Sequence, residues 1–150
     1  MLESRIEKTR TAIEIEISRV VTRFEKECMG RGPLETRTFI VDDMVIVRLK
    51  GVLTPAEQQL AQAEDGRSRY LLKQVRNELL IRSRPMLDVL IRDIVGIDVQ
   101  SVHTDISTKT GERIIVFTLQ SRPNFARSSE GTACDTPHAA SGSTNGATSR

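Results

Sequence analysis

Apolar residues recur at helical spacing in two long stretches of the chain, residues 2–28 and 67–95. The first stretch carries a stripe of Leu2, Ile6, Ile13, Ile17, Val20 and Phe24, and the second a stripe of Leu72, Val75, Leu79, Met86, Leu90 and Ile94. A recurrence near 3.6 residues is typical of an amphipathic helix that lays one face on a core. The pattern therefore predicts two long helices, and Pro85 predicts a kink or a split in the second, because proline lacks a backbone donor.

A shorter helix is predicted from the segment TPAEQQLAQAEDGR at residues 54–67. Thr54 suits the N-cap position, Pro55 suits the first helical position, and Glu57 completes a capping box. Glycines at positions 30, 66 and 96 interrupt or end the helical stretches, since glycine readily adopts the left-handed backbone that terminates a helix.

Four shorter runs, at about residues 36–41, 44–50, 97–107 and 112–120, are rich in β-branched and apolar residues. Asp42 and Asp43 separate the first two runs by a tight turn, and Gly111 suits the left-handed position of a longer hairpin loop. The element order is α-β-β-α-β-β. We therefore expect an α+β fold with a four-stranded, mainly antiparallel sheet packed against helices.

The composition changes after residue 120. Residues 121–150 consist mainly of Ser, Thr, Gly, Ala and Asn, and Phe125 is their only large apolar side chain. Such a segment buries too little surface to offset the entropy of ordering it. We expect one domain over residues 1–120 and a disordered, low-complexity tail over residues 121–150 that adds nothing to the core.

Composition and charge exclude several classes of function. The 150-residue chain has 22 basic and 20 acidic residues, a balance that does not indicate nucleic-acid binding. Aromatic residues make up only 3%, so no base-stacking surface is expected. Cys28 and Cys134 provide neither a disulfide framework nor a zinc site. With no signal peptide and no apolar run long enough to span a membrane, we expect a reducing, cytoplasmic setting.

The strand predicted over residues 97–107 holds the pattern that most resembles catalytic chemistry. Alternation places Ser101, His103, Asp105 and Ser107 on one face, where a carboxylate can fix the tautomer of a neighbouring imidazole. Acyl transfer also needs a nucleophile on a strained turn and an oxyanion hole, and the sequence contains no G-x-S-x-G. A metal site would lack ligands, since the only other histidine lies in the tail. We favour a polar strand face and expect no catalytic residue, no metal and no cofactor.

Three further features have both a functional and a plain structural interpretation. The GRGP segment at residues 30–33 presents Arg31 and backbone donors to an anion, or simply ends a helix in a turn. Asp42 and Asp43 offer carboxylates to a cation, but turn chemistry explains them better. Basic residues border the apolar stripe of the second long helix. They could bind an anionic surface or an acidic partner, but we favour the interpretation that their long aliphatic side chains shield the core from solvent. These residues are Arg69, Lys73, Arg76 and Arg82.

Several segments, in unbroken order, carry a family resemblance: GRGP, RTFIVDDMVIVRLKGVLTPAEQQLA, EDGR, LLKQVRNELL and DISTKTGERIIVFTL. Over roughly residues 5–120 the chain resembles the MpsC domain of the sodium-translocating, membrane-potential-generating system, formerly catalogued as a bacterial domain of unknown function. The resemblance implies a small soluble component associated with a membrane system that handles cations or bicarbonate. It implies no catalytic residue.

These observations favour a non-enzymatic accessory or regulatory domain that acts through protein contacts. We expect it in the cytoplasm, either free or held at the inner face of the membrane by an integral-membrane partner. The alternative is a small-anion or nucleotide sensor, or an uncharacterised enzyme, that uses the polar sheet face around Arg48, His103 and Asp105. Together with Arg31 these are the candidate ligand-binding residues. A pocket that joined the three sheet residues would favour the alternative.

The apolar residues of the predicted sheet also indicate self-association. Phe39, Ile40 and Val41 follow one another in one strand, so both faces of that strand are apolar, and helices cover only one face of such a sheet. Ile6, Ile13 and Val20, at near-heptad spacing in the first helix, offer another self-complementary surface. We therefore expect a homodimer or a stable contact with another protein.

Overall fold

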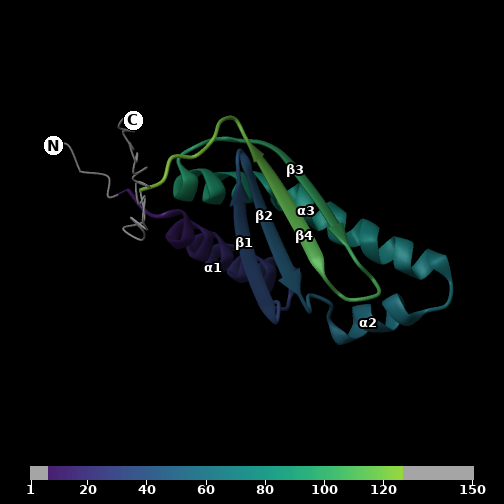
Figure 1. Ribbon diagram of the computed structural model, residues 1–150. Helices are drawn as coiled ribbons and strands as arrows, with labels where there is room; N and C mark the ends of the chain where they lie inside the picture. The colour runs from purple at the N-terminus through teal and green to yellow at the C-terminus, as the bar shows by residue number, and fades with distance from the viewer. Residues whose placement is uncertain (1–6, 127–150) are drawn as a thin grey trace, which may run out of the picture.

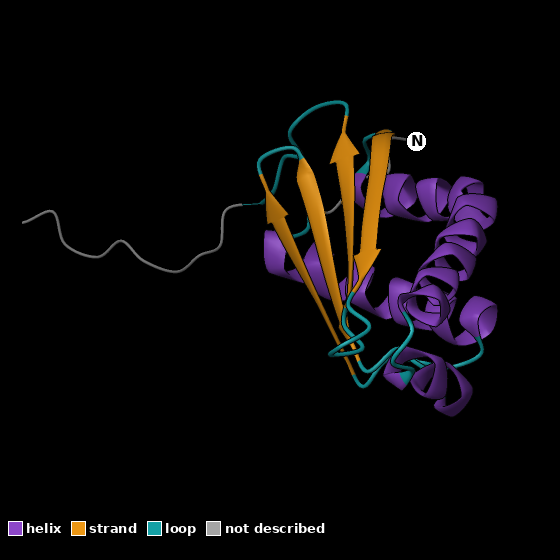
Figure 2. Cartoon of the chain, turned by 90° about the vertical axis from the view of Figure 1, so that its right-hand side faces the viewer, coloured by secondary structure: helices purple, strands orange, loops and turns teal. Residues whose placement is uncertain are grey.

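The computed structural model describes residues 7–126, which form three helices and one four-stranded antiparallel sheet (Figure 1). In chain order the elements are α1 (Arg10–Met29), β1 (Glu35–Val41), β2 (Met44–Lys50), α2 (Pro55–Gln62), α3 (Gly66–Val95), β3 (Val99–Ile106) and β4 (Arg113–Leu119). The helices lie on one side of the sheet (Figure 2). The predicted α+β class and antiparallel sheet are confirmed.

Helix α1 begins later than the apolar pattern predicted. Thr9 is its N-cap and accepts a hydrogen bond from the N–H of Ala12, and residues 7–9 are not helical. Residues 1–6, which the prediction placed in this helix, lie outside the described residues. The helix ends as predicted at Gly30, whose φ of 82° is left-handed.

The apolar face of α1 packs on the sheet. Ile13, Ile17, Val21 and Phe24 are buried in the core, and α1 makes its most extensive contacts with β1. The expectation that Ile13 belongs to a free, self-complementary surface is therefore wrong, because that side chain is only 5% exposed. Any self-association must use another part of the molecule.

Two hairpins form the sheet, whose strand order is β1-β2-β4-β3. The β1–β2 turn is the predicted two-residue one, with Val41 paired to Met44 and Asp42 in the left-handed region at φ 53°. The β3–β4 loop contains Gly111 at φ 69°, as predicted. The hairpins join along β2 and β4, so β1 and β3 form the edges of the sheet.

Helices α2 and α3 begin with side-chain caps. Thr54 and Glu57 form the predicted capping box of α2. Asp65 caps α3 by accepting a hydrogen bond from the N–H of Ser68. Pro85 lies inside α3, which continues as one helix to Val95, so the predicted split does not occur.

The core-facing side of α3 differs from the stripe that the apolar pattern predicted. Its buried residues are Leu72, Arg76, Leu80, Leu87 and Ile91. Of the predicted stripe, Leu72 is buried and Ile94 packs against the core, whereas Val75, Leu79 and Met86 are 55%, 38% and 46% exposed. Helix α3 carries apolar residues on two adjacent strips, and the prediction found only part of the buried strip because Arg76 interrupts it with a charge.

The core lies between the helices and one face of the sheet. Alternate residues of β2 and β4 form that face: Val45, Val47, Leu49, Ile115, Phe117 and Leu119, each at most 1% exposed. No helix of residues 7–126 covers the opposite face (Figure 2). There Phe39 is 45% exposed, and Ile46 and Val116 are only half-buried.

The chain beyond β4 contributes to the core, contrary to prediction. Pro123 is buried, and Phe125 is partly buried against the core cluster. The N–H of Ala126 donates to the carbonyl of Lys8 at 3.2 Å, which ties this segment to the start of α1. A single aromatic side chain in a polar segment was too weak a signal to reveal this packing. Residues 127–150, with Cys134 and His138, lie outside the described residues.

Candidate functional site

The sheet residues predicted to bind a ligand share the uncovered face but do not contact one another. Arg48 and Asp105 are both paired with Ile114 of β4, and His103 is paired with Val116. Apolar side chains of β4 therefore separate Arg48 from the two β3 residues. The strand alternation predicted for this face is confirmed.

Each predicted residue engages a different partner. Arg48 Nη2 lies 2.7 Å from Glu112 Oε2, and His103 Nε2 lies 3.1 Å from Ser101 Oγ. Asp105 Oδ1 accepts from Lys73 Nζ of α3 at 3.0 Å. Arg31, in the loop after α1, donates from Nη1 to the carbonyl of Leu53 at 3.3 Å. The structure thus brings together none of the four.

Asp105 forms the only one of these contacts that carries a resolved change in acidity. The hydrogen bond from Lys73 holds the pKa of the Asp105 carboxyl below its ordinary value, with desolvation opposing this effect. The Asp105 side chain is 77% exposed, so solvent screens the pair and its contribution to stability is small.

A different group of charged residues is buried between the helices and the sheet. Glu25 of α1, Arg76 of α3 and Arg113 of β4 are each at most 1% exposed. Glu25 Oε1 lies 3.0 Å from Arg113 Nη1, and Glu25 Oε2 lies 3.3 Å from Arg76 Nη1. One carboxylate therefore bridges two guanidinium groups from separate elements.

Glu57 of α2 completes this buried charge network and also caps its own helix. Arg76 donates from Nε to Glu57 Oε1 at 2.7 Å and from Nη2 to Oε2 at 2.6 Å, which is a bidentate pair. Glu57 Oε2 also accepts from the N–H of Thr54 at 2.8 Å. Burial raises the pKa of Glu57, but hydrogen bonds from Arg76 and Thr54 outweigh it, and the net pKa is lowered.

The network of Glu25, Glu57, Arg76 and Arg113 holds two positive and two negative charges, so it is neutral as a whole. The two arginines also donate hydrogen bonds outside the network. Arg76 Nη2 donates to the carbonyl of Val52 at 2.8 Å, and Arg113 Nε donates to Thr104 Oγ1 at 3.2 Å. Burial raises the pKa of Glu25, although Arg113 and Arg76 oppose the change. The bridging geometry favours the ionised carboxylate because both partners are permanent cations.

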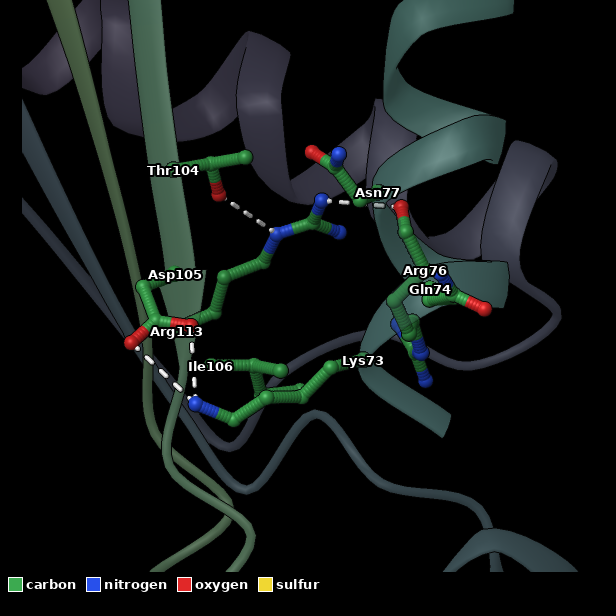
Figure 3. A pocket seen from close by; sticks show the side chains of 8 residues that line it. All are labelled: Lys73, Gln74, Arg76, Asn77, Thr104, Asp105, Ile106 and Arg113. Carbon is green, nitrogen blue, oxygen red and sulfur yellow. Dashed lines mark hydrogen bonds and ion pairs between the residues drawn. The ribbon is translucent and has the colours of Figure 1, made fainter. Parts of the chain in front are cut away.

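A cavity of about 210 Å³ opens beside the network, between α3 and β3 (Figure 3). Its lining comprises Lys73, Gln74, Arg76, Asn77, Thr104, Asp105, Ile106 and Arg113. It thus includes Asp105 but neither Arg48 nor His103, so this cavity does not join the three sheet residues. Lys73 is neutralised by Asp105 and the guanidiniums by Glu25 and Glu57, which leaves no uncompensated charge to select an anion.

The buried charges were not found from the sequence, although the sequence contains a signal for them. Arg76 was interpreted as one of the surface cations that shield the core, and it is instead 1% exposed. Arg113 occupies the same alternation as Ile115 and Phe117, and Glu25 follows Val21 by one helical turn. Charged residues at core-facing positions on separate elements are the pattern to look for, since a buried charge requires a partner.

The fold and these contacts define an α+β domain whose sheet is covered on one side and whose core is tied by a neutral charge network. The chain belongs to the MpsC family, described as "Na+-translocating membrane potential-generating system (MpsC)", which matches residues 9–121. It is 43% identical over 114 residues to the uncharacterized protein YbcI of Bacillus subtilis (strain 168), covering 76% of this chain and 90% of that protein. No solved structure matches the chain. Within residues 7–126 we find no helix with the length and apolar character to cross a membrane.

Proposed function

We propose that this chain is a non-catalytic accessory or regulatory domain of a sodium-translocating, membrane-potential-generating system. It acts by binding a protein component of that system at the inner face of the membrane. Membership of the MpsC family supports the association with such a system. The uncovered face of the sheet supports the mode of action.

The composition of that face is typical of a protein interface. Phe39 and Ile46 are cross-strand partners, and Val116 lies beside Ile46 on the next strand, which makes an apolar centre. Ion pairs border it: Arg48 with Glu112 at 2.7 Å and Lys50 with Glu35 at 3.0 Å. An apolar centre with a charged margin matches the anatomy of protein–protein contacts. Monomeric proteins seldom expose a large contiguous apolar surface.

We propose that the chain is not a catalyst because its buried charged groups are already paired with one another. The buried cations and carboxylates hold one another at 2.6–3.3 Å and join α1, α2, α3 and β4. Their hydrogen-bonding capacity is directed at the protein, not at a reacting group. On the sheet face, His103 hydrogen-bonds to Ser101 within strand β3, without the strained strand-to-helix turn that an activated nucleophile requires.

Complementation tests the proposed function. In a host from which the gene for this chain has been deleted, we would measure the sodium-dependent membrane potential with a potential-sensitive dye. Wild type and a Leu60→Lys control should restore it, and the double variant Phe39→Lys/Ile46→Lys should not. Leu60 lies on α2 and is 44% exposed, which matches the 45% of Phe39. The same double variant should lose co-purification with the membrane component.

Two results would overturn the proposal at different levels. A deletion that leaves the sodium-dependent potential unchanged would remove the functional assignment. A double variant that is folded by circular dichroism and restores the potential fully would show that the uncovered sheet face is not the binding surface.

A further inference from the structure

Helix α3 exposes an apolar strip along most of its length, interrupted by Arg82 between Leu79 and Met86. The strip consists of Leu71, Val75, Leu79, Met86 and Val89, which are 47%, 55%, 38%, 46% and 43% exposed. At about 100° per residue these five positions fall within about 80° of the helix circumference. They lie directly beside the buried side of α3 and are not part of it.

This α3 strip differs from the scattered apolar residues that any protein surface carries. Single exposed apolar side chains need no explanation, whereas a contiguous apolar surface marks an interaction site. The strip belongs to one helix of 30 residues, and no described element packs over its five side chains. A straight apolar strip on a long helix fits another helix with a matching strip.

We propose that a second copy of this chain covers the strip, with the two α3 helices antiparallel about a two-fold axis near residue 80. Four of the five positions are arranged nearly symmetrically about that point, and Leu79 lies next to the axis. Leu71 faces Val89 of the second copy, and Val75 faces Met86 of the second copy. By symmetry each contact occurs twice, as a closed two-fold dimer requires.

Two charged residues, Arg82 within the strip and Glu78 at its edge, specify the antiparallel direction. Glu78 and Arg82 are both exposed, and neither forms an ion pair with another residue in the described part of the chain. In the antiparallel arrangement, Glu78 of each copy faces Arg82 of the other, which gives two complementary pairs. In a parallel arrangement the two Arg82 side chains, which lie within the strip, would face each other, and Glu78 would not be level with Arg82 of the other copy.

This inference is independent of the proposed function, because α3 and the uncovered sheet face lie on opposite sides of the sheet (Figure 2). A dimer formed through α3 leaves Phe39 and Ile46 free to bind another protein. It also gives the predicted homodimer a definite surface in place of the buried face of α1.

A charge exchange on the full-length chain tests the pairing. In light scattering at micromolar concentration the wild type should have twice the chain mass of 16.8 kDa. Glu78→Arg and Arg82→Glu should each raise the dissociation constant at least tenfold, because each replaces complementary pairs by like charges. The double variant Glu78→Arg/Arg82→Glu should restore the dimer, because the pairs re-form with their signs exchanged. Both residues are exposed, so thermal melting should confirm that all variants are folded.

Cysteine crosslinking then fixes the direction. In a Cys28→Ser/Cys134→Ser background, a mixture of Val75→Cys and Met86→Cys chains should form a disulfide between copies, and neither variant alone should do so. Crosslinking of Val75→Cys with itself would overturn the antiparallel arrangement. A monomeric wild type would overturn the proposal entirely, as would a dimer that resists both single charge changes but is lost in Phe39→Lys.

Discussion

Glu25 Oε1 and Arg113 Nη1 lie 3.0 Å apart although the two residues are 88 positions apart in the chain. Both side chains are fully enclosed, so neither can be rescued by water when the other is removed. The pair joins the first helix to the last strand, and Arg76 extends it to α3. The connection between the first helix and the last strand therefore depends on a charged group, not only on apolar packing.

Removing one member of this pair should be far more damaging than removing both. We expect Glu25→Ala or Arg113→Ala to destabilise the domain by about 3–5 kcal/mol, because each leaves a buried charge without its partner. The double variant Glu25→Leu/Arg113→Met should cost less than the sum of the single changes, since it leaves neither charge behind. Urea unfolding followed by circular dichroism measures all four free energies.

An exposed ion pair provides the comparison. Arg92 Nη1 and Asp98 Oδ1 are 3.9 Å apart, and their side chains are 51% and 58% exposed. Asp98→Ala should change stability by less than about 1 kcal/mol, because solvent screens such a pair. Additive, equally small effects at Glu25 and Arg113 would contradict the assignment of the buried network as the tie between α1 and β4.

The acid sensitivity of the fold should depend on Glu57. Its pKa is lowered from 4.5 in the folded state, mainly by its hydrogen bonds with Arg76 and Thr54, which outweigh desolvation. A carboxyl with a depressed folded-state pKa contributes stability above its unfolded pKa, and this contribution is lost as the pH falls through the folded value. Glu57→Gln should therefore be less stable than wild type at pH 7, and the gap should narrow below about pH 4.5.

The pKa of Glu25 is shifted in the opposite direction to that of Glu57. Burial raises its folded-state pKa above 4.5, although Arg113 and Arg76 oppose the change, so Glu25 does not add to the loss of stability at low pH that is expected for Glu57. A free-energy difference between wild type and Glu57→Gln that stays constant from neutral pH to pH 3 would refute the role of Glu57. Chemical denaturation at a series of pH values gives the measurement.

Structural features that depend on neighbouring residues could be predicted from the sequence, whereas contacts between residues distant in the chain could not. The capping box at Thr54, the turn at Asp42 and the left-handed Gly111 follow from residues within a few positions of one another. The charge network follows from residues on four elements, and no local rule connects Glu25 with Arg113. The predicted core face of α3 combined buried Leu72 with exposed Val75, Leu79 and Met86, because two adjacent strips of this helix are apolar and periodicity alone does not separate them.

The segment after β4 should stabilise the domain through Phe125, which packs against the core cluster. Truncation after Gln120 should lower the melting temperature, and we expect a loss of about 1–3 kcal/mol for a partly buried aromatic side chain. Truncation after Ala126 should have little effect, because residues 127–150 are rich in Ser, Thr, Gly and Ala. Phe125→Ala in the full chain should reproduce most of the loss, and identical melting curves for the two truncations would contradict it.

The β1–β2 turn offers a substitution that should stabilise the protein. Asp42 has a φ of 53° at the first central position of the two-residue turn, where glycine avoids the penalty that a side chain incurs. In the described part of the chain, Asp42 is the one non-glycine residue with positive φ, so Asp43 does not share this strain. Asp42→Gly should therefore raise the free energy of unfolding by a few tenths of a kcal/mol up to about 1 kcal/mol, after allowance for the greater freedom of glycine in the unfolded chain. The 3.3 Å contact between Asp42 and Arg122 is exposed and should contribute little against this gain.

Asp43→Gly is the matched control and should destabilise slightly, because it adds unfolded-state entropy without relieving strain. Thermal melting of the two variants decides the matter, and a turn in which both changes destabilise equally would show that the Asp42 backbone carries no strain.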